Sequence, residues 1–333
     1  MRLSLCVAGC GRYARTVLQD IHDMTDDLEL FFASRDINKA RQYCEEFGGT
    51  GFFGSYEEAA ADPRVKAMYF ATPHDLHLEN TLLAANNGKH ILVEKPIARN
   101  LAESIQMIQA ARKAEVKLMV AENVRFFPVV QQSKAVIDEG TIGQPRLIQI
   151  QAERLRPYAG WRTSKEVMGG GVFIDGGIHF VDMMVCFGGF PERVYAVKPP
   201  QVLLDMEGED SIVMVANLPS GGVGLINFSE GSPIKGMRRK ISVAGTRGHL
   251  DFDLFGTELS IETPESSRTV RVPDARNGAR GMVSEFRNSI IEDREPSMSG
   301  HEALSDLVVV LGAYRSSEEG RAVSLSLPKA DAG

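Results

Sequence analysis

Short apolar runs and longer segments with helical spacing alternate along the first 122 residues of the chain. Ser55 and Asn100 each stand three positions before a glutamate, which is the pattern of a helix N-cap. The alternation predicts βαβ units, and right-handed crossovers between them predict a doubly wound parallel sheet. The predicted strands are residues 3–8, 28–33, 67–71, 90–93 and 117–121, and the predicted helices are residues 13–24, 37–47, a short one opening at Ser55, 75–87 and 101–115.

Beyond Pro128 the pattern changes to many strand-like runs, most of them separated by Gly and Pro turns. This pattern predicts a mainly antiparallel sheet with a few helices. The predicted fold class is therefore α/β, with a doubly wound N-terminal domain at residues 1–122 and a C-terminal α+β domain with an open, mainly antiparallel sheet at residues 123–333. The strand-like runs are 146–154, 194–198, 211–218, 222–227, 240–244, 249–254, 259–262, 269–272 and 323–327, and the helices are 132–139, 178–187, 282–292 and 303–319.

Composition agrees with two globular domains and argues against several classes of protein. The chain has 333 residues, of which 43% are hydrophobic and 24% charged, and domains usually hold roughly 150 residues. Its net charge of −7 offers nothing to hold a polyanion, so we expect neither nucleic acid nor a membrane as partner. No apolar run reaches the ~18 residues that span a bilayer. The four cysteines lack metal-ligand spacing, so we expect reduced thiols, a cytoplasmic protein and no metal site.

A glycine-rich motif follows the first predicted strand. Gly9-Cys10-Gly11-Arg12-Tyr13-Ala14 reads G-x-G-x-x-A and opens the first predicted helix. Gly9 allows a tight turn, Gly11 lets backbone N–H groups approach a pyrophosphate, and Ala14 lets the helix pack on the strand. An ordinary strand–turn–helix glycine turn would look similar. The position at the start of a βαβ series favours a dinucleotide-binding Rossmann domain, with Gly9, Gly11, Arg12 and Tyr13 at the coenzyme.

The residue that ends the second strand of a Rossmann domain meets the adenosine ribose of the coenzyme. Here that position is Ser34, followed by Arg35 and, at the opening of the next helix, Lys39. A hydroxyl donor, a planar cation and a further positive charge suit a 2′-phosphate, so we predict that NADP binds better than NAD. If the strand ended two residues later, the carboxylate of Asp36 would bind the ribose hydroxyls and NAD would be preferred.

Two further segments carry residue types that suit proton and hydride transfer. Lys95 follows a predicted strand at the carboxyl edge of the parallel sheet, where ligands collect in open α/β folds. Asp175 and His179 are four residues apart, so a helix beginning at Asp175 would present both on one face. Beside a nicotinamide, these three groups could move a hydroxyl proton while hydride leaves the carbon. Taken singly, each has a simpler interpretation: a solvated lysine, a helix cap and a half-buried histidine.

Four motifs follow one another in a recognisable order: GCGRYA at 9–14, ATPHDLH at 71–77, VEKP at 93–96 and GGGVFIDGGIH at 169–179. Together they resemble the glucose–fructose oxidoreductase, inositol dehydrogenase and rhizopine-catabolism family, Gfo/Idh/MocA, over residues 3 to about 327. The resemblance implies an N-terminal Rossmann domain, a C-terminal substrate-binding and oligomerisation domain, and NAD or NADP as coenzyme. It implies hydride transfer between nicotinamide and a CH–OH or ketone group of a sugar, cyclitol or related polyol.

The resemblance also implies roles for the matching residues. Lys95 would contact the substrate hydroxyl and the nicotinamide, His179 would donate or accept the proton, and Asp175 would bind substrate and orient the histidine. The family often has an acidic residue where this chain has Ser34 and Arg35, which puts strict use of NAD in doubt. The residues that the resemblance places at the coenzyme are Thr72, Pro73, His77, Glu94, Lys95 and Pro96.

Polar and aromatic residues near these motifs are weaker candidates for substrate binding. Trp161, the only tryptophan, could stack on a sugar face or simply pack as an aromatic residue. The run 238–240 (Arg-Arg-Lys) is interpreted as a solvated strand end rather than a phosphate site. The weaker candidates are Asn123, Arg125, Arg156, Tyr158, Trp161 and Arg162.

The sequence leaves alternatives open for the substrate and for the activity. The same chemistry could act on a dihydrodiol or an imine, or the chain could be a non-catalytic dinucleotide-binding sensor. The presence of a lysine, an aspartate and a histidine suited to proton transfer argues against the sensor. Apolar residues such as Ile212, Val213 and Val215 are expected on the sheet face that helices leave bare, so we predict a homodimer or homotetramer.

Overall fold

The computed structural model describes residues 2–274 and 278–328, and these divide into two compact units. The described residues of unit 1 are 2–123 and 279–304, and those of unit 2 are 124–274, 278 and 305–328. The chain thus leaves unit 1 next to the boundary expected from the sequence. Residues 279–304, which the sequence assigned to the second domain, form part of unit 1.

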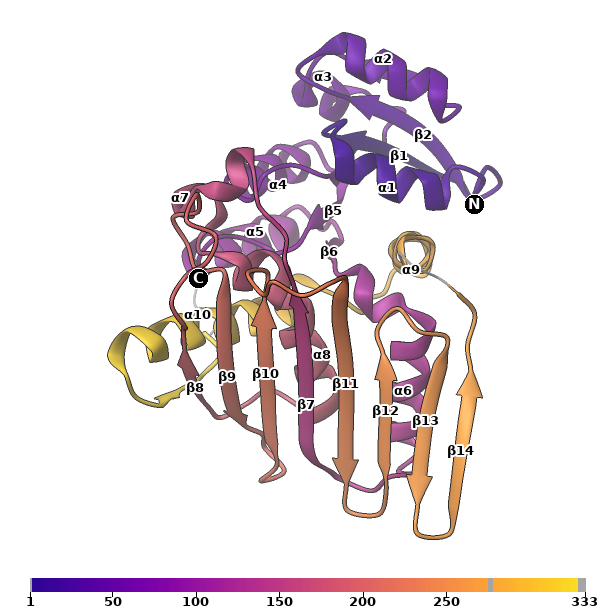
Figure 1. Ribbon diagram of the computed structural model, residues 1–333. Helices are drawn as coiled ribbons and strands as arrows, with labels where there is room; N and C mark the ends of the chain where they lie inside the picture. The colour runs from indigo at the N-terminus through magenta and orange to yellow at the C-terminus, as the bar shows by residue number, and fades with distance from the viewer. Residues whose placement is uncertain (1, 275–277, 329–333) are drawn as a thin grey trace. The chain divides into compact units, whose positions relative to one another are not determined.

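Unit 1 is built around a six-stranded parallel sheet with strand order β3-β2-β1-β4-β5-β6 (Figure 1). This order confirms the predicted doubly wound sheet. The strands are added on one side of β1 up to β3 and on the other side from β4, so the strand order reverses between β1 and β4. A strand that the sequence analysis missed, β3, has only three residues. The elements are β1 (Leu3–Ala8), α1 (Arg12–Ile21), β2 (Leu28–Ala33), α2 (Ile37–Glu46), β3 (Gly51–Phe53), α3 (Tyr56–Ala61), β4 (Ala67–Phe70), a 3-10 turn (His74–Leu76), α4 (His77–Asn86), β5 (His90–Glu94), α5 (Leu101–Lys113), β6 (Leu118–Ala121), α9 (Ala279–Ile291) and the start of α10 (Gly300–Glu319).

The sequence explains these elements locally. Every residue of β4 is buried, which is why the strand reads as a continuous apolar run without alternation. Both expected caps are present: Ser55 Oγ accepts from the Glu58 N–H at 3.1 Å, and Asn100 Oδ1 accepts from the Glu103 N–H at 3.0 Å. The α9 helix packs against α1 and buries an apolar face that includes Phe286.

Unit 2 is built around a nine-stranded sheet with strand order β14-β13-β12-β11-β7-β10-β9-β8-β15. Only the β7–β10 pair is parallel among the described strands of this sheet, so the prediction of a mainly antiparallel sheet is confirmed. The elements are α6 (Pro128–Asp138), β7 (Pro145–Arg154), α7 (Lys165–Met168), a π-helical turn (Phe173–Gly177), α8 (Ile178–Gly188), β8 (Arg193–Val197), β9 (Ser211–Asn217), β10 (Val223–Ser229), β11 (Met237–Gly245), β12 (His249–Asp253), β13 (Glu258–Thr263), β14 (Ser266–Arg271), the rest of α10 and β15 (Val323–Ser324), with 3-10 turns at Asn123–Phe126 and Gly160–Thr163.

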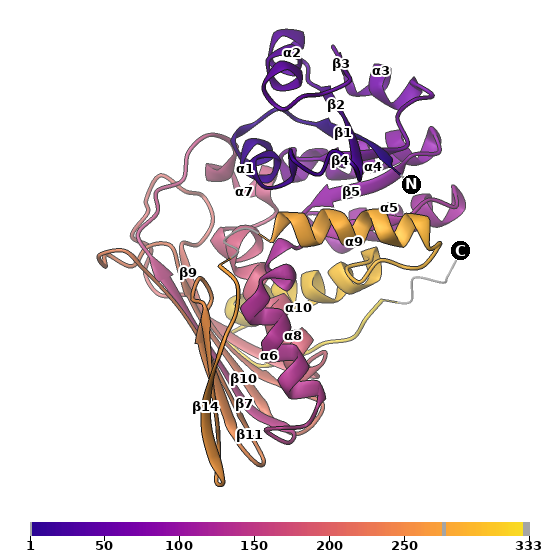
Figure 2. The same ribbon diagram turned by 90° about the vertical axis from the view of Figure 1, so that its right-hand side faces the viewer.

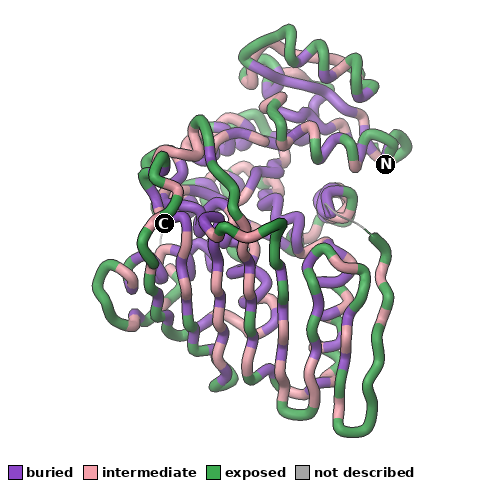
Figure 3. Tube along the Cα trace, in the orientation of Figure 1, coloured by how far each residue is buried: buried purple, intermediate pink, exposed green. Residues whose placement is uncertain are grey.

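The two faces of this sheet differ. Helices α6 and α8 lie on one face (Figure 2), and burial alternates along the strands (Figure 3). Ile212 is fully buried, while its neighbour Val213 and then Val215 point to the other face. The expectation that all three share the bare face is therefore wrong for Ile212, because successive residues of a strand point to opposite sides. Tyr195 and Val197 also lie exposed on the bare face.

The helical stretch Lys165–Gly188 is more apolar than the sequence analysis allowed. It has 24 residues and an 18-residue window of mean hydropathy 1.4, so by length and composition alone it could cross a membrane. No uninterrupted apolar run of 18 residues occurs in it, because Asp175 and Asp182 interrupt the stretch, so the threshold is reached only on mean hydropathy. Within the protein, 78% of that window is buried, as in the core helix of a globular protein.

Candidate functional site

The loop after β1 has the form that a pyrophosphate requires. Gly9 has a φ of +99°, and a Cβ at this position would lie 2.7 Å from the carbonyl oxygen of Ala71. Gly11 is the N-cap of α1 and makes no side-chain cap, and a Cβ there would meet nothing within 4 Å. A ligand can therefore approach the first N–H groups of α1 past Gly11, which has no side chain to block it. Ala14 is buried, as expected. The residues present fit a dinucleotide.

The end of β2 lies where the sequence placed it. β2 ends at Ala33, so Ser34 is the first residue beyond the strand, and its Oγ accepts from the Asp36 N–H at 3.1 Å. Asp36 is the N-cap of α2, and its Oδ1 accepts from the Asn38 N–H at 3.1 Å. Arg35 is exposed. The carboxylate that would favour NAD therefore caps a helix, while the arginine points to solvent.

The loops after β4 and β5 are joined by a histidine. His77 is fully buried, with Nε2 3.1 Å from the Thr72 carbonyl oxygen and Nδ1 2.9 Å from the Pro96 carbonyl oxygen. Burial lowers the pKa of His77 to about 3, so the ring is neutral and can donate to one of these carbonyls at a time. Thr72 Oγ1 also accepts from Asn80 Nδ2 at 3.0 Å. His77 therefore links the backbone of Thr72 to that of Pro96.

The residue next to Lys95 is held within unit 1. Glu94 ends β5, is buried, and accepts a hydrogen bond from the Tyr69 hydroxyl at 2.5 Å. Lys95 follows, half-buried, and its peptide bond to Pro96 is cis. Because β1, β4 and β5 are adjacent, their carboxyl ends bring the glycine loop, Thr72 and Lys95 to one edge of the sheet.

In unit 2, Asp175 and His179 lie on consecutive helical turns of different kinds. Asp175 belongs to the π-helical turn, and His179 to the first turn of α8. The sequence predicted a helix over residues 178–187, and α8 begins at Ile178 as predicted; Asp175 lies before it in a π turn, a geometry that is frequent at functional sites. Asp175 is only 3% exposed, and its Oδ2 accepts from Arg162 Nε at 3.2 Å. The Arg162 guanidinium lies 4.3 Å from the ring centroid of Trp161, so these residues form one group.

The glycine run before Asp175 is required by close packing. A Cβ on Gly170 would lie 2.6 Å from the Tyr314 hydroxyl, and one on Gly171 would lie 2.3 Å from the Glu209 carbonyl oxygen. The Tyr314 hydroxyl accepts from the N–H groups of Gly171 and Ile174 at 3.2 and 3.1 Å, and donates to Glu209 Oε1 at 2.8 Å. Tyr314 and Glu209 therefore fix the backbone that carries Asp175. Sequence analysis missed both, because the tyrosine sits inside an apolar helix.

The weaker candidates fall into different settings. Arg125 Nε donates to the buried Asp182 at 2.7 Å, so it forms an internal ion pair with α8, while Asn123 is buried at the end of unit 1. The exposed Arg156 places its guanidinium 5.1 Å from the ring centroid of Tyr158.

The interpretation of 238–240 as a solvated strand end is wrong for Arg239. This residue is 4% exposed, because its side chain points to the helix-covered face of the sheet.

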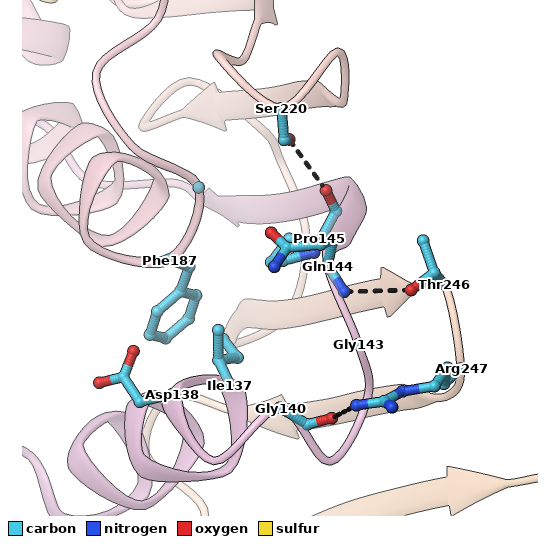
Figure 4. Close-up of a pocket in the computed structure, with 11 residues that line it drawn as sticks. Ile137, Asp138, Gly140, Gly143, Gln144, Pro145, Phe187, Ser220, Thr246 and Arg247 are labelled. Atoms are coloured by element: carbon cyan, nitrogen blue, oxygen red, sulfur yellow. Dashed lines mark hydrogen bonds between the residues drawn. The ribbon is translucent and has the colours of Figure 1, made fainter.

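Unit 2 also has a cavity of about 610 Å³ away from these residues (Figure 4). It lies at the start of β7, the opposite end of that strand from Arg154. Its polar groups bond to one another: the Gln144 N–H donates to Thr246 Oγ1 at 3.1 Å, and Ser220 Oγ donates to the Pro145 carbonyl oxygen at 3.2 Å. None of the residues predicted for catalysis or binding lines this cavity.

A glycine loop at the reversal point of a doubly wound sheet, followed by a second unit carrying an aspartate and a histidine on one helix, defines a nicotinamide-dependent oxidoreductase. The chain belongs to the Gfo/Idh/MocA family. The family model described as "Oxidoreductase family, NAD-binding Rossmann fold" matches residues 3–122, and that of the "GFO/IDH/MocA C-terminal domain" matches residues 130–251. Lys95 belongs to unit 1, while Asp175 and His179 belong to unit 2.

Relatives of known activity support this assignment. A trans-1,2-dihydrobenzene-1,2-diol dehydrogenase of Xenopus tropicalis is 31% identical over 256 residues, which cover 69% of this chain and 77% of the relative. A myo-inositol 2-dehydrogenase of Thermotoga maritima is 28% identical over 333 residues, covering 96% and 97%. The crystal structure of an aldose-aldose oxidoreductase from Caulobacter crescentus complexed with glycerol has a TM-score of 0.89 at 25% identity, covering 98% of this chain and 100% of that one.

Proposed function

We propose that the protein is an NAD(P)-dependent dehydrogenase or reductase that transfers a hydride between nicotinamide and a CH–OH or ketone group of a sugar, cyclitol or related polyol. The observation that carries this proposal is the Arg162–Asp175 contact one turn before His179, which places a fixed carboxylate and an imidazole on the same helical segment. The activities of the inositol and aldose relatives support the substrate class.

The proposed mechanism assigns each group one task. A nicotinamide coenzyme held at the glycine loop of residues 9–14 would supply hydride transfer in either direction. His179 takes the hydroxyl proton as hydride leaves the carbon, and returns a proton to the oxygen in the reverse direction. Asp175, fixed by Arg162, binds the substrate and orients the imidazole, and Lys95 provides a positive charge to the substrate oxygen.

We propose NADP as the preferred coenzyme. Ser34 and the exposed Arg35 follow β2 directly, and Lys39 lies exposed in the first turn of α2. A 2′-phosphate would accept charge-assisted hydrogen bonds from such groups. Asp36 supports the same preference, because its carboxylate serves as the cap of α2.

A second substrate class has its own support. The dihydrodiol dehydrogenase relative is 31% identical, which makes a cyclic trans-diol without a sugar framework the alternative substrate for the same residues. Such a diol offers the same CH–OH group to His179, so the chemistry proposed above is unchanged and only the substrate framework differs.

The proposal is tested with the full chain and both coenzymes. Absorbance at the reduced nicotinamide band is followed across a panel of sugars, cyclitols, open-chain polyols and a trans-dihydrodiol, in both directions. We expect turnover with at least one member, and its loss in His179→Ala. Coenzyme binding without turnover by any member would instead indicate the non-catalytic sensor.

We also propose a homodimer or homotetramer that forms through the bare face of the nine-stranded sheet, in the cytoplasm. Tyr195, Val197 and Val215 are 43%, 45% and 38% exposed there, an apolar surface that a second copy would cover. The four free cysteines fit a reducing compartment. Light scattering that reports a 36.5 kDa monomer at micromolar concentration would contradict the assembly.

A further inference from the structure

Charged side chains gather at one end of the helix-covered face of the nine-stranded sheet. Strands β11, β7 and β10 are neighbours, and Arg239, Arg154 and Glu230 lie in or directly after them. Arg239 pairs in register with Ala152, which is buried on this face. Arg154 and Glu230 each stand two residues after a buried residue of their own strand, so all three side chains share the face.

In this group the guanidinium groups of Arg154 and Arg239 share the carboxylate of Glu230. Arg154 donates to both oxygens of Glu230, from Nε at 2.5 Å and from Nη2 at 2.8 Å. Arg239 reaches the same carboxylate only at 3.6 Å, although its side chain is almost fully buried. The neighbouring carboxylate of Asp210 accepts from the N–H groups of residues 202 and 203. Burial and the charge of Arg154 lower the pKa of Arg239 to about 10, in spite of Glu230. A buried cation with a shared partner is costly for the protein.

A tyrosine beside this group has a buried hydroxyl with no hydrogen-bond partner among the residues that the structure describes. Tyr158 is 8% exposed, and the exposed Arg156 lies over its ring. The Arg156 N–H donates to the Glu230 carbonyl oxygen at 2.8 Å, which ties this segment to the end of β10. Buried hydroxyl groups are nearly always satisfied, so this one points to a ligand oxygen.

The group adjoins the turn that carries Asp175. A Cβ on Gly176, the next residue, would lie 3.7 Å from Glu230 Oε1. Burial, followed by the negative charges of Asp175 and Glu230, raises the pKa of Tyr158, so its phenol lies within reach of both charges. The arginines, the phenol and the proposed acid–base residues thus belong to one part of unit 2.

We propose that the substrate is anionic: a polyol that carries a carboxylate or phosphate group, bound by Arg156, Arg239 and the Tyr158 hydroxyl while Asp175 and His179 act on its CH–OH group. This inference rests on the proposed function and narrows its substrate class to sugar acids or sugar phosphates. Both anions present paired oxygens that match the planar fork of a guanidinium, and a protonated phenol adds a neutral donor. A neutral polyol would leave the buried guanidinium of Arg239 with only the shared Glu230, at 3.6 Å, as its carboxylate partner among the described residues.

The first experiment compares substrates that differ only in charge. The full chain, with its preferred coenzyme, is assayed on glucose, glucuronate and glucose 6-phosphate, and on other neutral sugars with their acids and phosphates. We expect an acidic member to exceed its neutral counterpart by roughly 10- to 100-fold in kcat/KM, the range of a charge-assisted hydrogen bond. Which acidic member responds distinguishes carboxylate from phosphate.

Variants then connect the preference to the residues. Arg156→Gln and Tyr158→Phe should each reduce kcat/KM for the acidic member about tenfold or more, and change that for the neutral member much less. Arg238→Gln is the matched control, because Arg238 is the neighbour of Arg239 on the opposite face of β11 and pairs with Glu153. Equal use of neutral and acidic members, or an acidic preference that survives both variants, would overturn the inference.

A binding measurement separates this inference from the proposed function. Calorimetry with the coenzyme-saturated protein compares tartrate and inorganic phosphate with threitol, which matches tartrate in its carbon chain and central hydroxyls. If no compound is turned over, the proposed function fails, yet tighter binding of either anion that Arg156→Gln weakens would still support anion recognition. Binding of tartrate and phosphate no tighter than threitol would overturn it.

Discussion

The Nε atom of Arg162 donates a hydrogen bond to Oδ2 of Asp175 at 3.2 Å, while the same guanidinium lies over the ring of Trp161. Arg162→Lys keeps the positive charge but loses the planar group that makes both contacts. We expect kcat to fall about tenfold, because the carboxylate loses its fixed orientation. Steady-state kinetics, with exposed Arg146→Lys as the control, measure this effect. An unchanged kcat would show that Asp175 needs no such support.

The residues proposed for catalysis give the sharpest expectation. His179→Ala should lower kcat by roughly 10²- to 10⁴-fold while coenzyme affinity barely changes. Lys95→Ala should lower turnover at least as much, because it removes a donor and a fixed charge together. Steady-state kinetics and coenzyme titration by fluorescence check both variants. Near-normal turnover in either would mean that the wrong residues have been chosen.

The proposed preference for NADP depends mainly on one exposed arginine. Arg35→Ala should reduce the NADP-to-NAD ratio of kcat/KM by about 10- to 100-fold, since a charge-assisted hydrogen bond to the 2′-phosphate is lost. Asp36→Asn is the control: asparagine also caps helices, so α2 should persist, and because the change removes a negative charge the ratio should not fall. Equal values for the two coenzymes before and after Arg35→Ala would refute the preference.

The buried His77 predicts how stability depends on pH. Its pKa is lowered by burial to about 3 from an ordinary 6.5, so between these values the unfolded chain binds a proton that the folded chain does not. Folding stability therefore falls as the pH drops through this window, by up to ~1.4 kcal/mol per pH unit from this group. His77→Gln should make the loss shallower, and His22→Gln, an exposed histidine of unit 1, should not. Urea unfolding at pH 7.5, 6 and 5 provides the comparison; parallel slopes for all three proteins would contradict it.

Local patterns in the sequence predicted most of the elements, because caps, apolar runs and glycine turns act over a few residues. The caps at Ser55 and Asn100 and the end of β2 at Ala33 are examples. What could not be predicted depends on packing between distant segments. Nothing near Tyr314 indicates that its hydroxyl binds the backbone of residues 171 and 174, and nothing in residues 238–240 indicates that the middle arginine is buried.

The place of α9 in unit 1 limits how this chain can be divided or recombined. The segment 1–123 lacks a helix that packs on α1, and the Arg287–Asp27 ion pair at 2.9 Å joins the two pieces. A gene fragment ending at residue 123 would expose to water the surface of α1 that α9 covers, and its product should aggregate. Exchanging the coenzyme-binding part with that of a relative therefore requires two transplanted segments, residues 1–123 and 279–304, rather than a single crossover.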